Sequence, residues 1–197
     1  KLVGYQHGPS SRRKMVYLNG KNELRVDSNG IDSFYLPQMV LAEDTYSADL
    51  YKESGYRNVK LMDRVYRLSY LKNIQRKESD KNYVLIVPGL HDGRHLLETM
   101  KHDILLNTKD TYILKPHPRA SNNYIGDYSY IENLTVSNSH ISKLLGMAKK
   151  VIVTYSSVAI EAKILGIDVE LVEVPGRVNE SPLIDGDFLS CIQNIKY

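Results

Sequence analysis

Short apolar runs alternate with longer amphipathic segments over the second half of the chain. The apolar runs predict strands at 83–87, 111–114, 134–136, 151–155 and 169–174. The segments between them predict helices at 95–106, 139–149 and 158–165. Strands and helices that alternate at this spacing are typical of right-handed βαβ units. The continuously apolar run at 151–153 also indicates a strand covered on both faces, so the pattern predicts an α/β fold with a parallel sheet.

The first half of the chain follows a similar but less regular pattern. It predicts strands at 1–5, 34–42 and 59–62 and helices at 43–54 and 64–71, with a polar, turn-rich excursion at 18–33. The segment 72–81 is dense in charge and has Ile74 as its one aliphatic residue, which is typical of a linker. The predicted organisation is therefore a first domain at 1–71, an exposed linker at 72–81 that lets the domains change their relative angle, and a second domain at 82–197.

Composition narrows the class of ligand. The 197 residues are 42% hydrophobic, enough for one large or two small domains. The net charge of +3 arises from 26 Lys and Arg against 23 Asp and Glu, and the chain has no basic run that would follow a phosphate backbone. This balance suits anionic small molecules and argues against a dedicated nucleic-acid binder.

Other sequence features bear on the cellular compartment. Cys191 is the single cysteine, which excludes an internal disulfide and fits a reducing compartment. No apolar stretch approaches the roughly 20 residues of a membrane-spanning helix. The sequence begins at Lys1, without an initiator Met and inside a predicted strand, which indicates a fragment of a longer protein.

In a parallel sheet, ligands bind beyond the carboxyl ends of the strands, so those ends are the place to look for chemistry. Ser156 and Ser157 follow the strand at 151–155 and precede a helix, where hydroxyls and unpaired N–H groups would hold a phosphate. On capping statistics alone, Ser157 is equally well explained as a helix cap. Glu161 lies four residues after Ser157, on the same helix face, and is placed to bind a ribose hydroxyl.

A second strand end carries a proline-bracketed histidine. Lys115, His117 and Arg119 lie in the sequence KPHPR after the strand at 111–114, where two prolines disfavour continuation of a strand or helix. A rigid loop with these three side chains could grip an anion, and the alternative is a stiff connection with exposed charges. Gly89 follows the strand at 83–87 and could let the backbone approach a phosphate, although neither a Walker A nor a dinucleotide glycine pattern is present.

Three further features concern histidines and the paired serines. His7 lies in the turn Gln6-His7-Gly8-Pro9 and is either a surface histidine or a cleft residue. His91 and His95 are one helical turn apart, but no HExxH motif or cysteine set supports a zinc site, so none is predicted. The paired serines lack the G-x-S-x-G frame of a nucleophilic serine, which favours phosphate binding.

Together, the KPHP motif and the TYSS motif with its following Glu-Ala resemble the C-terminal half of GT-B glycosyltransferases. Within that group the motifs are most similar to bacterial surface-polysaccharide enzymes, including polysialyltransferase-like proteins and CDP-glycerol glycerophosphotransferases of teichoic-acid synthesis. The Gln6-His7-Gly8 turn also resembles a His-Gly turn of the latter group. UDP-N-acetylglucosamine 2-epimerases are a more distant resemblance. The similarity spans most of 83–175 and, more loosely, 3–71.

The resemblance implies roles for the matching residues. His117 would contact or protonate the leaving phosphate of the nucleotide, Ser156 and Ser157 would hold that phosphate, and Glu161 would bind the ribose. His7 would face the reacting centre from the other domain, as a base or as a donor at the acceptor site. The paired-acid-Gly motif that supplies the base in polysialyltransferases is not found, and the acidic stretch 185–187 follows the nucleotide-binding elements and is not expected to replace it.

These implications define the expected protein. Its fold would be GT-B-type, with a nucleotide-sugar-binding Rossmann-like domain at 82–197 preceded by part of an acceptor-side Rossmann-like domain at 1–71. It would be a metal-independent, cofactor-free glycosyltransferase of bacterial surface-polysaccharide synthesis. Inactivity of the fragment on its own would be compatible with this expectation. The donor would be a CMP-, CDP- or UDP-linked sugar and the acceptor a carbohydrate.

The expected location is cytoplasmic, with peripheral association at the inner membrane face allowed. Two alternatives remain open: an epimerase acting on a UDP-sugar, and a noncatalytic nucleotide-sugar-binding module. The sequence leaves the sugar, the base of the nucleotide, the acceptor and the oligomeric state undetermined.

Overall fold

The computed structural model describes residues 2–14, 19, 37–76 and 82–197. The predicted excursion at 18–33 lies almost wholly outside these residues, as does part of the predicted linker. Within the described ranges, no helix is both long and apolar enough to cross a lipid bilayer. The chain forms two compact units, which we call unit 1 (Lys1–Arg67 with Glu180–Tyr197) and unit 2 (Leu68–Asn179).

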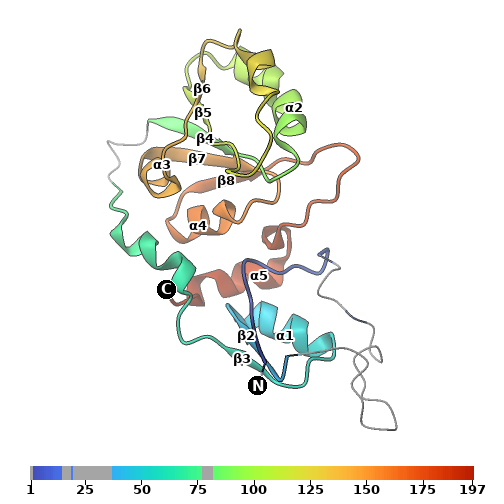
Figure 1. The fold of residues 1–197 in the computed structure, drawn as a ribbon. Coiled ribbons are helices and arrows are strands. Elements are labelled where there is room, and N and C mark those ends of the chain that lie inside the picture. The colour runs from blue at the N-terminus through green and yellow to red at the C-terminus, as the bar shows by residue number, and fades with distance from the viewer. Residues whose placement is uncertain (1, 15–18, 20–36, 77–81) are drawn as a thin grey trace. The chain divides into compact units, whose positions relative to one another are not determined.

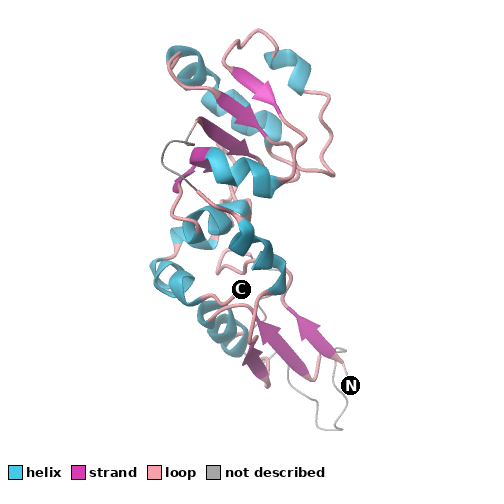
Figure 2. Cartoon of the chain, turned by 90° about the vertical axis from the view of Figure 1, so that its left-hand side faces the viewer, coloured by secondary structure: helices cyan, strands magenta, loops and turns pink. Residues whose placement is uncertain are grey.

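Unit 2 contains a five-stranded sheet among its described residues, with the strand order β6-β5-β4-β7-β8. The strands are β4 (Tyr83–Val87), β5 (Tyr112–Leu114), β6 (Leu134–Val136), β7 (Ala148–Val153) and β8 (Asp168–Leu171). Every pairing is parallel; Leu85 of β4 is in register with Ile113 on one side and with Val151 on the other. The predicted parallel α/β fold is confirmed. Figure 2 shows the alternation of strands (magenta) and helices (cyan).

The helices of unit 2 cover both faces of this sheet (Figure 1). They are α2 (Gly93–Leu106), α3 (Ile141–Met147) and α4 (Val158–Ile164), with a short 3₁₀ helix at Ile125–Tyr128. Leu96, Leu97, Met100 and Ile104 form one stripe of α2 and are buried against strand residues such as Ile86. On the other face, the Tyr83 hydroxyl donates to the Leu144 carbonyl of α3 at 2.8 Å. Because both faces are covered, all five residues of β4 are buried.

Unit 1 is built on a three-stranded parallel sheet among its described residues, in the order β1-β2-β3. The strands are β1 (Val3–Tyr5), β2 (Met39–Ala42) and β3 (Val59–Leu61), and the helix after β2 is α1 (Thr45–Glu53). Asp44 caps α1 by accepting a hydrogen bond from the Ser47 N–H at 2.7 Å. Burial raises the pKa of Asp44 despite this bond.

The C-terminal segment also belongs to unit 1, which differs from the predicted second domain at 82–197. It contains α5 (Gly186–Cys191) between two 3₁₀ helices, Pro182–Ile184 and Ile192–Asn194. The Tyr46 ring of α1 packs edge-on against Phe188 at 5.6 Å between centroids, and its hydroxyl donates to Asp185 at 2.5 Å. Burial and this bond raise the pKa of Tyr46 to about 12. These contacts attach the C-terminal segment to α1.

The boundary between the units also differs from the predicted one. A 3₁₀ helix, Tyr66–Asn73, spans the change from unit 1 to unit 2 at 67/68, before the predicted linker at 72–81 begins. Lys72, Asn73 and Gln75 are exposed, but Arg76 donates to the carbonyls of Leu165 and Ala148 at 2.9 and 2.7 Å. The described part of that segment is therefore attached to unit 2.

Several predicted helices differ from the structure by one or two residues at their ends, and in one case the predicted end lies inside a strand. The helix expected at 139–149 ends at Met147, and Ala148 already begins β7. Pairing with β4 explains this early end, since Ala148 is in register with Tyr83 and Lys150 with Val84. Lys150 also pairs with Glu170 at 2.6 Å, so tertiary contacts outweigh the helix propensity of the Ala-Lys-Lys run.

Candidate functional site

Four loops leave the carboxyl edge of the unit 2 sheet beside a cavity of about 570 Å³. Since β4 lies between β5 and β7, the loops that follow β5 and β7 flank the loop that follows β4. The lining residues come from four strand ends: Val87, Pro88, Lys115, Pro116, His117, Pro118, Asn122, Asn138, Ser139, His140, Ile141, Ser156, Ser157 and Val158. Four of the predicted site residues, Lys115, His117, Ser156 and Ser157, therefore share one cavity.

The two serines lie in the turn between β7 and α4. The Ser156 hydroxyl oxygen accepts a long hydrogen bond, 3.4 Å, from the Val158 N–H. Ser157 occupies the N-cap position with helical backbone angles (φ −60°, ψ −20°), and its side chain makes no capping hydrogen bond. Ser157 thus occupies the cap position without capping the helix through its hydroxyl, and a phosphate-binding role for this hydroxyl stays a prediction.

His117 lies in the stiff loop after β5, and its ring nitrogens have different surroundings. Nδ1 accepts from the Arg119 backbone N–H at 3.2 Å, so a neutral imidazole carries its hydrogen on Nε2 and can donate from there. Burial lowers the pKa of His117, as do the positive charges of Arg119, His91 and Lys115, while Asp92 acts in the opposite direction. The lowered pKa favours the neutral imidazole, which can donate from Nε2.

Three predicted nucleotide-binding residues are not among those that line the cavity. Glu161 is 7% exposed and accepts a hydrogen bond from the Tyr70 hydroxyl at 2.5 Å. Arg119 is exposed and acts on His117 through its charge and backbone. Gly89 packs closely against Tyr155: a Cβ at position 89 would lie 2.7 Å from the Tyr155 ring, so this contact leaves no room for a side chain. Direct nucleotide contacts by these three residues stay predictions.

The sequence interpretation missed the segment that leaves β6. Asn138, Ser139 and His140 line the cavity, and His140 is the N-cap of α3, where Nδ1 accepts from the Ser142 N–H at 3.3 Å. The His140 ring also packs edge-on against Tyr70, with centroids 6.1 Å apart. The sequence pattern could have identified this segment, because its residues follow a correctly predicted strand at the same edge of the sheet.

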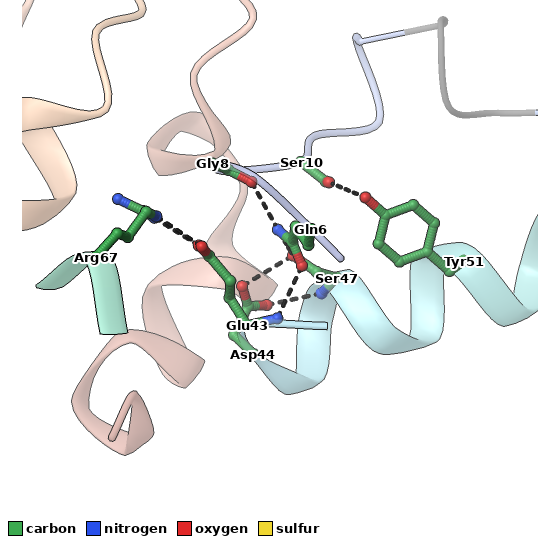
Figure 3. Close-up of polar contacts among 8 residues, drawn as sticks. All are labelled: Gln6, Gly8, Ser10, Glu43, Asp44, Ser47, Tyr51 and Arg67. Atoms are coloured by element: carbon green, nitrogen blue, oxygen red, sulfur yellow. Dashed lines mark hydrogen bonds and ion pairs between the residues drawn. The ribbon is translucent and has the colours of Figure 1, made fainter. Parts of the chain in front are cut away.

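His7 lies in unit 1, in the turn after β1. Figure 3 shows how the buried Gln6 side chain holds this turn. The Gln6 amide donates to the Gly8 carbonyl at 2.8 Å and to the Ser47 hydroxyl at 3.1 Å, and its oxygen accepts from the Glu43 N–H at 2.8 Å. Gly8 has φ +103°, a conformation that favours glycine. His7 itself is exposed and lines a cavity of about 170 Å³ within unit 1.

A buried ion pair stabilises the same region of unit 1. The Arg67 guanidinium donates to both carboxylate oxygens of Glu43, at 2.6 and 2.5 Å (Figure 3). The Glu43 side chain is 3% exposed, so this pairing satisfies a carboxylate that water scarcely reaches.

In the part of the chain that the structure describes, no group of three or more His, Cys, Asp or Glu side chains is arranged to hold a metal ion. Metal independence of the reaction stays a prediction.

The fold that these elements define is a mixed α/β fold with parallel sheets, of the Rossmann-like kind found in GT-B proteins. A similar solved structure is the UDP-GlcNAc 2-epimerase from Neisseria meningitidis bound to UDP-GlcNAc, with a TM-score of 0.57 and 13% identity over 75% of this chain and 47% of that chain. At this identity the similarity shows the fold alone.

Two weaker structural similarities are to polymerising and sugar-binding proteins. The wall teichoic acid polymerase TagF has a TM-score of 0.47 and 14% identity, over 98% of this chain and 59% of that chain. HepE of Anabaena, in complex with UDP and glucose, has a TM-score of 0.46 and 16% identity, over 98% and 63%. The chain thus spans about half to two thirds of the length of these proteins. No family model and no curated protein sequence matches the chain.

Proposed function

We propose that this chain is the nucleotide-sugar-binding part of a glycosyltransferase, or of a related transferase, that acts in bacterial surface-polysaccharide synthesis. The observation that carries the proposal is the shared cavity of unit 2. Residues from separate strand ends, predicted from sequence as phosphate ligands, line it together. The donor would be a CMP-, CDP- or UDP-linked sugar.

The chemistry of the cavity suits departure of a nucleotide phosphate. Transfer of a sugar leaves negative charge on that phosphate, and donors aimed at it stabilise the transition state. His117 offers an Nε2–H, Lys115 a positive charge, and Ser156 and Ser157 two hydroxyls. These groups would share the charge without a metal ion.

The remaining roles complete the proposal. Deprotonation of the acceptor hydroxyl would fall to a base outside this cavity, and His7 is the candidate from the sequence. Glu161 would bind the ribose after exchanging its hydrogen bond with Tyr70 for one with the nucleotide.

Nucleotide binding provides the first test. Thermal-shift measurements with CMP, CDP, UMP, UDP and GDP should show selective stabilisation, since a ligand at 100 times its Kd raises the free energy of unfolding by about 2.7 kcal/mol. The double substitution Ser156→Ala/Ser157→Ala should weaken binding of the best nucleotide by about 1–3 kcal/mol, because hydrogen bonds to a charged group are lost.

The folding stability of that variant should change by less than about 1 kcal/mol, since Ser157 makes no capping bond. Ser129→Ala/Ser190→Ala is a matched control, because both serines are exposed and neither lines the cavity. Calorimetry that gives the same affinity for wild type and for the Ser156/Ser157 variant would refute the phosphate site.

The second candidate is epimerisation of a UDP-sugar, favoured by the similarity to the UDP-GlcNAc 2-epimerase. An epimerase removes a proton from the sugar ring and returns one from solvent. Incubation of the full-length protein with UDP-GlcNAc in D₂O would therefore incorporate deuterium without an acceptor, whereas a transferase would release UDP when an acceptor is present. Tight nucleotide binding with neither outcome would indicate the noncatalytic module.

A further inference from the structure

Asp92 is a buried acidic residue in the loop between β4 and α2. It is fully buried and occupies the N-cap position of α2. An aspartate there ordinarily accepts hydrogen bonds from the first turn of its own helix, yet the Asp92 side chain makes none. Instead, Oδ2 accepts from the Thr154 hydroxyl, and Oδ1 has no hydrogen-bond partner among the described residues. The Asp92 side chain thus binds the residue that follows β7 and not its own helix.

Thr154 connects this carboxylate to the proposed phosphate site. It directly follows β7, is 4% exposed, and lies two residues before Ser156. The Asp92–Thr154 bond therefore joins the loop after β4 to the turn that carries the paired serines. Both residues also line a cavity of about 10 Å³, enough for about one water molecule.

We propose that Asp92 and Thr154 form a positioning pair that fixes the Ser156–Ser157 turn relative to the loop after β4, the strand that lies between β5 and β7, in the nucleotide-bound state. The inference rests on the proposed function, because it assigns the pair to the same phosphate site. Neither residue is proposed to touch the nucleotide, since neither lines the larger cavity.

The charge of Asp92 provides a second connection to that site. The charged groups that act on His117 are Arg119 and Lys115 from its own loop and His91 and Asp92 from the loop after β4. Of these four, Asp92 alone raises the pKa of His117. On the other side, Asp92 raises the pKa of the buried Tyr124, which Arg94 lowers. Removal of the Asp92 charge should therefore lower the pKa of His117 further.

The test uses UDP as the probe and separates the hydrogen bond from the charge. Thr154→Val keeps the shape but removes the donor, and should raise the Kd for UDP about 3- to 10-fold, as expected for one lost hydrogen bond. Thr154→Ser restores a hydroxyl and should bind within about 2-fold of wild type. Asp92→Asn keeps an acceptor for Thr154 but loses the charge. The rise in UDP affinity on acidification should therefore begin at a lower pH in this variant than in wild type.

Two matched controls have the same chemistry elsewhere in unit 2. Thr99→Val and Asp103→Asn change exposed residues of α2 and should leave the Kd and its pH profile unchanged. Circular dichroism confirms at each pH that the variants compared are folded. If Asp92→Asn does not fold, the Thr154→Val and Thr154→Ser pair still decides, because both keep the Asp92 charge.

The outcomes distinguish this inference from the proposed function. Weaker UDP binding by Thr154→Val with rescue by Thr154→Ser supports the pair. Wild-type affinity in Thr154→Val, or an equal loss in Thr154→Val and Thr154→Ser, overturns it while the phosphate site stands. A wild-type chain that binds neither UDP nor any other nucleotide of the panel overturns both.

Discussion

At the residue scale, His117 combines partial burial, nearby positive charge and a defined tautomer. Its pKa lies below the ordinary value of about 6.5, mainly because burial disfavours the charged ring. Folding stability contributed by this group is present above about pH 6.5 and is lost as the pH falls, since the unfolded chain binds the proton more readily. An anionic ligand beside the ring would instead favour the protonated imidazole.

UDP binding should therefore be coupled to proton uptake by His117. A phosphate beside the ring raises its pKa in the complex, so UDP affinity should rise as the pH falls from 7 towards and below 6.5. Calorimetry in buffers with different ionisation enthalpies measures the protons taken up. His117→Gln is the control, because it retains only the protonation of UDP itself. Equal proton uptake by wild type and His117→Gln would exclude His117 from the phosphate site.

The Glu43–Arg67 pair gives a prediction about stability. Arg67→Ala leaves a carboxylate that is 3% exposed without its counter-charge, and should lower the free energy of unfolding by about 3 kcal/mol. Arg12→Ala is the comparison, because Arg12 and Glu53 are 50% and 55% exposed and such pairs contribute less than about 1 kcal/mol. Urea denaturation measures both changes. Similar effects would show that burial of Glu43 does not determine the strength of its pair.

Where one rule was sufficient, the sequence predicted which side chains lie close together, while their roles in nucleotide binding stay predictions. Lys115, His117, Ser156 and Ser157 all follow strands of one parallel sheet, so their convergence follows from the carboxyl-edge rule. Glu161 was placed by helical spacing from Ser157, which identifies a helix face but not its neighbours. Here that face meets Tyr70, from a segment 91 residues away in the chain.

At the element scale, two helix glycines differ in how much space lies beside them for a side chain. Gly93 is the first residue of α2, and a Cβ there would lie 2.0 Å from the Tyr124 hydroxyl oxygen. Gly93→Ala should therefore destabilise the chain by about 1–3 kcal/mol through overpacking. A Cβ at Gly146 in α3 would have its nearest neighbour outside the helix backbone, an Ile74 methyl, at 3.7 Å.

Gly146→Ala should accordingly be neutral or stabilising by up to about 1 kcal/mol, because alanine favours a helix. Thermal unfolding of the two single variants measures the contrast. An equal loss of stability in both would contradict the packing described for Gly93.

The bounds of two strands could be predicted from the sequence pattern alone. The strands Tyr83–Val87 and Leu134–Val136 have the bounds expected from sequence. The end of α3 was not predictable from local preference, because pairing of Ala148–Lys150 with β4 determines it. Such pairing is a tertiary contact that a local pattern does not contain.

At the scale of the whole molecule, the alternating pattern predicted the parallel α/β fold, but composition did not locate the division into units. The polar segment at 72–81 suggested a linker, yet Arg76 attaches its described part to β7 and α4. The return of 180–197 to unit 1 depends on Tyr46 meeting Asp185 and Phe188. Contacts between residues about 140 positions apart leave no local signal in a single sequence.

The central claim is that the cavity at the carboxyl edge of the unit 2 sheet binds a nucleotide through its phosphate. A crystal structure of the chain with the nucleotide that gives the largest thermal shift is its most direct test. We expect phosphate oxygens within about 2.7–3.2 Å of His117 Nε2 and of a Ser156 or Ser157 hydroxyl. A nucleotide bound elsewhere, or one whose phosphate contacts neither the histidine nor the serines, would contradict the account.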